Sequence, residues 1–158
     1  MVNKQQGLTL IELMVSLTLV GILLMSCLSL GRSIHQENQL QGMEDEITMA
    51  VRYARNMALL HQTTLVLSPL PNTTDWSEGM MLFVDNKSHK YHSDKILHQW
   101  QWQHKGIHVF WDGFQSNHYL IFSSELKQAA TSGHFDIFND EIMHSKLVIN
   151  RFGRISKR

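Results

Sequence analysis

The feature that most constrains this chain is an apolar run from Leu8 to Gly31, in which Glu12 is the only charged residue. As a helix, a run of this length spans about 36 Å, which is enough to cross a hydrocarbon core of about 30 Å. A buried core helix is the alternative, but such helices usually carry a polar stripe, and the serines and threonines here are too few to form one. We therefore expect a transmembrane segment over residues 8–31.

A short polar leader precedes the apolar run, and Lys4 is its only charged residue. A lysine on this side orients the segment with its N-terminus inside, so that the residues after Arg32 lie outside the cytoplasm. A cleaved secretory signal is less compatible with the pattern, because the apolar stretch is too long and the leader carries a single lysine. The only cysteine, Cys27, lies within the run, so no intramolecular disulfide can form.

A helical repeat continues beyond the apolar run, over residues 32–62. Apolar side chains recur there at spacings of three and four, and charged side chains occupy the opposite face, which predicts an amphipathic helix packed on a domain. No proline precedes Pro69, so the simplest interpretation is one helix from about Leu8 to His61. The predicted buried face comprises Leu40, Met43, Ile47, Val51, Ala54, Ala58 and His61, and the predicted exposed face Gln36, Glu37, Glu44, Asp45, Arg52 and Arg55.

The remainder, residues 63–158, consists of short runs rich in β-branched and aromatic residues, separated by turn-forming segments. Such a succession of short strands predicts antiparallel sheets rather than alternating βαβ units, and hence an α+β protein with a β-rich head domain. The predicted strands lie within residues 63–70, 79–85, 96–103, 107–111, 119–123, 134–138 and 146–156.

Glu12 is the first candidate functional residue. A charged side chain at the centre of a membrane costs about 2.5–3.5 kcal/mol on insertion scales, and such a residue is functional by default. Snorkelling toward the nearby interface explains how the carboxylate is tolerated, but not what it is for. Cleavage after Gly7 would create an α-amino group on Leu8, one helical turn from Glu12, and the two charges would neutralise each other within one chain or between neighbouring copies.

The segment from Gly7 onward, GLTLIELMVSLTLVGILL, resembles the class III signal of type IV pilins and type II secretion pseudopilins. The resemblance implies that a prepilin peptidase removes residues 1–7 and N-methylates Leu8. It also implies that Glu12 guides the subunit into a growing filament. The expected location is the bacterial inner membrane, with a single pass and a periplasmic head. Leu8 departs from the family, which usually has phenylalanine there, and no helix-kinking proline lies near residue 29.

Three further segments resemble the GspH/FimT family of minor pilins and pseudopilins. They are ITMAVRYARNMALLHQTTLVL at the junction of helix and first strand, WSEGMMLFVD with the spacing W-x-x-G-x-x-x-F-x-D, and INRFGRIS near the C-terminus. The resemblance implies a pilin-like fold, with two β-sheets packed on the long helix, and other pilins or pseudopilins as partners. The signature residues expected to have structural roles are Trp76, Gly79, Phe83, Asp85 and Gly153.

The C-terminal segment forms the one clear patch of charge in a chain whose formal net charge is zero. Clustered arginine and lysine gain affinity for DNA by releasing counterions, whereas a solvated chain end is the alternative. Some FimT-like minor pilins bind DNA through a C-terminal G-R-x-R motif, and here Ser156 replaces the second arginine. The candidate residues for binding double-stranded DNA are Lys146, Arg151, Arg154, Lys157 and Arg158.

Other kinds of site find little support in the sequence. The histidines lack the compact spacing of a zinc site, so no metal or other cofactor is expected. Trp100 and Trp102 share one face of a strand and are expected to pack in the core rather than to stack on bases. No nucleophile elbow, phosphate-binding loop or catalytic carboxylate pair occurs, so an enzyme is not expected.

The sequence therefore predicts a structural subunit of a bacterial filament. A minor type IV pilin, with DNA uptake in natural transformation as an added role, is one hypothesis. A GspH-like minor pseudopilin of the type II secretion system is the alternative. The strongly basic C-terminal segment favours the pilus.

Overall fold

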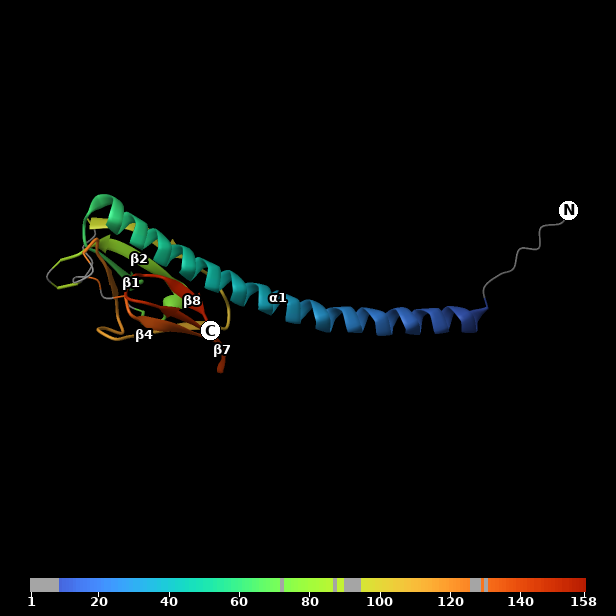
Figure 1. Ribbon diagram of the computed structural model, residues 1–158. Helices are drawn as coiled ribbons and strands as arrows, with labels where there is room; N and C mark the ends of the chain where they lie inside the picture. Colours follow the sequence, from blue (N-terminus) through green and yellow to red (C-terminus); the bar gives the residue numbers. More distant parts are fainter. Residues whose placement is uncertain (1–8, 72, 87, 90–94, 126–128, 130) are drawn as a thin grey trace. The chain divides into compact units, whose positions relative to one another are not determined.

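The computed structural model describes most of the chain, and Figure 1 shows its long helix and its strands. Residues 1–8, which include the expected cleavage position between Gly7 and Leu8, lie outside the described residues. The chain forms two compact units, residues 1–38 and residues 39–158. The described residues are 9–71, 73–86, 88–89, 95–125, 129 and 131–158, and the side chains of residues 26–34 are not among them.

The first unit is helical from Leu10 onward, within the long helix α1 (Leu10–His61). Its large apolar side chains between Leu10 and Met25 are 52–80% exposed. The hydroxyl groups of Ser16 and Thr18 donate to carbonyl oxygens of the same helix, at 2.7 and 2.8 Å. These polar groups are thereby satisfied without a partner outside the helix.

The transmembrane segment expected over residues 8–31 is not confirmed by the structure. In the part of the chain whose placement is described, no helix was found that combines the length and the apolar character needed to cross a membrane. Leu8 and the side chains of residues 26–31 lie outside that part.

In the second unit, α1 buries one face. The side chains at the predicted spacing from Leu40 to Ala58 are 0–3% exposed, so the predicted helical period is confirmed. His61 was also expected on this face, but it is exposed, because α1 ends there and the chain turns at Gln62, whose φ is 50°. Glu44 was expected on the exposed face, but it is only 6% exposed, because polar partners on other elements enclose its carboxylate.

Two antiparallel four-stranded sheets make up the rest of the second unit, so the predicted α+β class is confirmed. The first sheet has the order β3-β2-β1-β5, and the second has the order β4-β6-β7-β8. A short 3₁₀ helix, η1 (Trp76–Glu78), precedes β2. The strands are β1 (Leu65–Pro69), β2 (Gly79–Val84), β3 (Ile96–Gln101), β4 (Ile107–Gly113), β5 (Leu120–Phe122), β6 (Gly133–Asn139), β7 (Ile142–Ile149) and β8 (Ile155–Lys157).

The last predicted strand, residues 146–156, is wrong in one respect, because the structure divides this segment into the antiparallel pair β7 and β8. A tight turn at Asn150–Gly153 reverses the chain, and Gly153 adopts a φ of 68°, a left-handed conformation that favours glycine. β7 also begins earlier than predicted, at Ile142.

The main core lies between α1 and the two sheets. Trp76 of η1 is 1% exposed and packs edge-to-face on Phe135 of β6, with 5.2 Å between ring centroids. Trp100 and Trp102 are partly buried against this core, as expected. Phe83 belongs to a smaller cluster on alternate positions of the first sheet, with Val66, Met81 and Ile121. Both faces of β1 and β2 are therefore covered by apolar side chains.

Gly79 allows the backbone of β2 to approach β3 closely. Its φ is 142°, and a Cβ atom placed on it would lie 2.2 Å from the carbonyl oxygen of Trp100. We expect Gly79→Ala to lower the free energy of unfolding by about 1–3 kcal/mol, because it adds both backbone strain and a clash with backbone. A urea titration of the detergent-solubilised protein, followed by tryptophan fluorescence, measures this change.

Gly42→Ala is the matched control for that experiment. Gly42 lies within α1, and a Cβ atom there would meet nothing within 4 Å. This substitution is expected to raise the free energy of unfolding by about 0.5–1 kcal/mol, because alanine loses less backbone freedom on entering a helix. Equal changes in the two variants would contradict the role given to Gly79.

Candidate functional site

The structure places Glu12 in the first turns of α1, on a helical segment whose other large side chains are apolar and exposed. Its backbone N–H lies 3.4 Å from the hydroxyl oxygen of Thr9, which helps to satisfy the start of the helix. None of the described residues bonds to the Glu12 carboxylate, and its expected partner, the amino group of a processed Leu8, belongs to the part of the chain that is not described. The carboxylate is thus presented on the surface of the helix.

The five basic residues predicted as one DNA-binding strip do not share one environment. Lys146 of β7 forms an ion pair with Asp136 of β6, with 3.3 Å between Nζ and Oδ1. Lys157 of β8 forms an ion pair with Glu44 of α1, with 2.7 Å between Nζ and Oε2. Two of the predicted contacts to phosphate therefore have carboxylate partners within the same chain. The arginines Arg151, Arg154 and Arg158 are exposed.

The carboxylate of Glu44 is the centre of a small polar cluster between α1 and the second sheet. One oxygen accepts a hydrogen bond from the hydroxyl of Ser145 at 2.5 Å, and the other forms the ion pair with Nζ of Lys157. The imidazole of His144 lies 3.9 Å from the same carboxylate. A buried carboxylate needs such partners, and this need explains why β8 is held against α1 at this point.

The turn between β7 and β8 is organised by the side chain of Asn150. Its Oδ1 accepts hydrogen bonds from the backbone N–H groups of Phe152 and Arg154, at 2.9 and 3.0 Å. Its carbonyl oxygen accepts from Gly153 N–H at 2.9 Å and from the hydroxyl of Thr131 at 3.0 Å. These bonds fix the turn, and Phe152 lies at it with 56% of its surface exposed.

Gly153 also brings the helix close to this turn. A Cβ atom on Gly153 would lie 3.2 Å from Cδ of Arg55, so the aliphatic part of that arginine packs directly on the glycine. A hollow of about 410 Å³ results, lined by Arg55, Asn150, Phe152 and Arg154. A smaller adjoining hollow is lined by Arg55, Arg151, Phe152 and Gly153 among others. Arg55 was not among the candidate residues, because its spacing in the sequence shows only that it lies on the predicted exposed face of the helix. The sequence does not show which segment packs on it.

The other signature residues lie in structural positions. Trp76, Gly79 and Phe83 belong to the core and the first sheet, as described above. Asp85 follows β2, where its N–H donates to the carbonyl of Thr64 at 2.9 Å and its carboxylate pairs with His89 at 2.7 Å. None of these residues lines the hollow at the β7–β8 turn.

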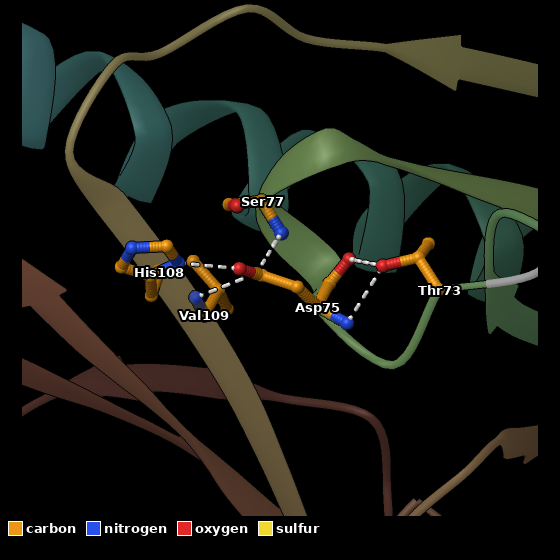
Figure 2. Close-up of polar contacts among 5 residues, drawn as sticks. All are labelled: Thr73, Asp75, Ser77, His108 and Val109. Atoms are coloured by element: carbon orange, nitrogen blue, oxygen red, sulfur yellow. Dashed lines mark hydrogen bonds and ion pairs between the residues drawn. The ribbon is translucent and has the colours of Figure 1, made fainter.

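Asp75, which the sequence analysis did not single out, joins η1 to β4 (Figure 2). Its Oδ1 accepts hydrogen bonds from the N–H groups of Ser77 and Val109, at 2.9 and 3.0 Å. Its Oδ2 lies 2.7 Å from Nδ1 of His108. Thr73 completes the turn, because its hydroxyl oxygen accepts from Asp75 N–H at 3.1 Å. The carboxylate therefore caps η1 and fixes β4 beside it.

These contacts lower the pKa of Asp75 from its ordinary value. Burial by itself would raise this pKa, but the hydrogen bonds from Val109, His108 and Ser77 favour the charged form and outweigh it. A carboxylate with a lowered folded-state pKa stabilises the fold above its unfolded-state pKa, and this contribution is lost as the pH falls through the folded-state value.

We expect Asp75→Ala to lower the free energy of unfolding by about 1–3 kcal/mol at pH 7, because it removes a helix cap and leaves buried N–H groups unpaired. The difference from the unchanged protein should shrink below about pH 3.9, where carboxylates take up protons. Urea titrations at pH 7 and pH 3 measure both effects. Asp45→Ala removes an exposed carboxylate of α1 and should change stability by less than about 0.5 kcal/mol. A loss for Asp75→Ala that is the same at both pH values would contradict the assigned role.

Five of the described histidines lie beside carboxylates at separate places rather than around a common point. Within the described residues, no group of three or more histidine, cysteine, aspartate or glutamate side chains is placed to hold a metal ion. Besides His89, His108 and His144, these pairs join His104 to Glu46 and place His134 beside Asp112 and Asp136.

Comparison with known proteins gives one match to the N-terminal sequence and further matches to the fold. Residues 2–28 match the family described as the prokaryotic N-terminal methylation motif. No curated protein sequence matches the chain. Among solved structures, the fold is similar to that of the type IV minor pilin FimU from Pseudomonas aeruginosa strain PAO1, in two crystal forms.

The first form has 18% sequence identity and a TM-score of 0.61, over 77% of this chain and 90% of that chain. The second has 17% identity and a TM-score of 0.57, over 75% of this chain and 91% of that chain. Identities this low establish similarity of fold alone. The methylation motif is a separate finding, because it comes from the sequence. The chain therefore carries a prokaryotic N-terminal methylation motif over residues 2–28, and its fold is similar to that of a type IV minor pilin.

Proposed function

We propose that the protein is a minor type IV pilin of the GspH/FimT family with a structural rather than a catalytic role. A prepilin peptidase removes residues 1–7 and methylates Leu8, and the helix is held in the inner membrane until the subunit joins a filament. The observation that carries this proposal is the methylation motif over residues 2–28, followed by a helical segment whose large apolar side chains are exposed. Such side chains require a cover of lipid or of neighbouring helices.

Glu12 acts during assembly in this proposal. An exposed carboxylate on an apolar helix is costly when the helix enters a filament core, unless a positive charge meets it there. The amino group of a processed Leu8, on the same subunit or on a neighbour, supplies that charge. Other pilins of the filament and the prepilin peptidase are therefore the expected partners.

A GspH-like minor pseudopilin of the type II secretion system is the alternative. It has the same leader, helix and head, so the motif over residues 2–28 and the fold support both functions equally. Neighbouring genes distinguish them, because a pseudopilin gene is expected within a cluster of secretion genes.

We expect Glu12→Ala to leave the protein processed and bound to the membrane but poorly incorporated into filaments, because the pairing charge is lost. Immunoblots of membrane and sheared-filament fractions measure processing and incorporation separately. Ser16→Ala is the matched control, since Ser16 lies one turn further along the same exposed helix. Normal incorporation of Glu12→Ala would contradict the pairing role.

Gly7→Val should block processing by the prepilin peptidase. A mature-sized product from that variant would overturn the cleavage assignment.

DNA binding is a second candidate function, and one observation favours it. Arg55, Arg151 and Arg154 lie around adjoining hollows at the β7–β8 turn, although Arg55 is far from the other two in the sequence. The described lining of these hollows contains no acidic residue. Guanidinium groups arranged in this way are suited to phosphate, and clustered phosphate contacts supply most non-specific affinity for DNA.

We expect the full-length protein in detergent to bind a labelled duplex with an affinity that falls steeply with salt. Arg154→Gln should weaken binding and reduce the slope of log K against log salt by about 0.9, the loss of one phosphate contact. Arg52→Gln is the control, because Arg52 lines a different surface hollow together with Glu44 and Asp45. An unchanged slope in Arg154→Gln would contradict a phosphate contact at this arginine.

A further inference from the structure

We propose that the β7–β8 turn binds single-stranded DNA in preference to duplex, with Phe152 stacking on an unpaired base and Arg55 and Arg154 contacting the flanking phosphates. This inference rests on the proposed DNA binding and specifies its ligand. Phe152 carries it, because this phenylalanine is 56% exposed and lines the same hollow as Arg55 and Arg154.

Phe152 is presented to solvent by a rigid turn. The hydrogen bonds from Phe152 N–H and Arg154 N–H to Asn150 hold the backbone on both sides of the buried Gly153. The ring is 56% exposed, whereas the neighbouring Phe122 on β5 is 2% exposed. An apolar ring held outward on a fixed backbone loses little conformational freedom on binding, which favours its use as a binding contact.

The charges around Phe152 favour a nucleic acid over an apolar partner. Arg55 and Arg154 line the same hollow as the ring, and Asn150 is the other residue of its lining among those that the structure describes. An aromatic face beside arginines is the combination by which proteins bind single strands, because every base offers a face for stacking and every nucleotide offers a phosphate.

The two lysines of the C-terminal segment form ion pairs within the chain, so they are less available for contacts to the phosphates of a duplex. Lys146 and Lys157 are paired with Asp136 and Glu44, and the basic residues that line the hollow beside Phe152 are Arg55 and Arg154. In a duplex the base faces are covered by their neighbours, and an aromatic ring reaches them only after unstacking, which costs a few kcal/mol. An unpaired strand presents these faces without that cost.

The experiment compares a labelled 20-nucleotide strand with a duplex of the same sequence, using the full-length protein in detergent and fluorescence anisotropy at several salt concentrations. Phe152→Leu keeps an apolar side chain but removes the aromatic face, and Phe152→Trp keeps a face for stacking. We expect tighter binding of the single strand, weakened about fivefold or more by Phe152→Leu and retained in Phe152→Trp. The salt dependence should stay unchanged in both variants, because the ring carries no charge.

Phe110→Leu is the matched control, because Phe110 is a similarly exposed phenylalanine on β4 that packs on Phe138 and has no place in the hollow. Equal affinity for strand and duplex, with no loss in Phe152→Leu, would overturn this inference and leave DNA binding in place. Absence of binding to either nucleic acid at low salt would overturn DNA binding as well. Loss of filament incorporation in Phe152→Leu, with single-strand affinity unchanged, would assign Phe152 to a contact between subunits and overturn the inference.

Discussion

The packing of the apolar face of α1 against both sheets is the interaction on which the head depends. The side chains from Leu40 to Ala58 at helical spacing are almost completely buried, and they belong to the same core as strands of both sheets. Buried side chains of α1, of both sheets and of η1 belong to this one cluster, so the helix contributes to the surface on which the two sheets meet.

The features that could be predicted from the sequence were local or periodic. The helical stripe follows from side-chain spacing, and most strands follow from short apolar runs between turn residues, because such patterns report directly on burial. The terminal hairpin was misjudged because its turn depends on the side chain of Asn150 bonding to the backbone two and four residues later. That bonding is a matter of three-dimensional geometry, and the apolar residues on either side gave no sign of the break.

The candidate site depended on contacts between distant segments, which a single sequence does not reveal. Arg55 was predicted on the exposed face of the helix, but it is half-buried, and nothing near it in the sequence indicated that Gly153 would pack on its aliphatic stem. The lysines were counted as one basic strip because the sequence places them close to the arginines. Their carboxylate partners, Glu44 and Asp136, lie on other elements, and their pairing changes the charge that the surface presents.

The burial of Glu44 has a consequence for the order of folding. Ser145, which donates to this carboxylate, lies 101 residues further along the chain, and Lys157 follows it on β8. Until those residues arrive, the apolar face of α1 carries an uncompensated acid at its margin, and docking of the helix on the sheets is opposed. Docking of α1 on the second sheet is therefore expected to be completed only together with the pairing of β7 and β8, which supply the partners of this carboxylate.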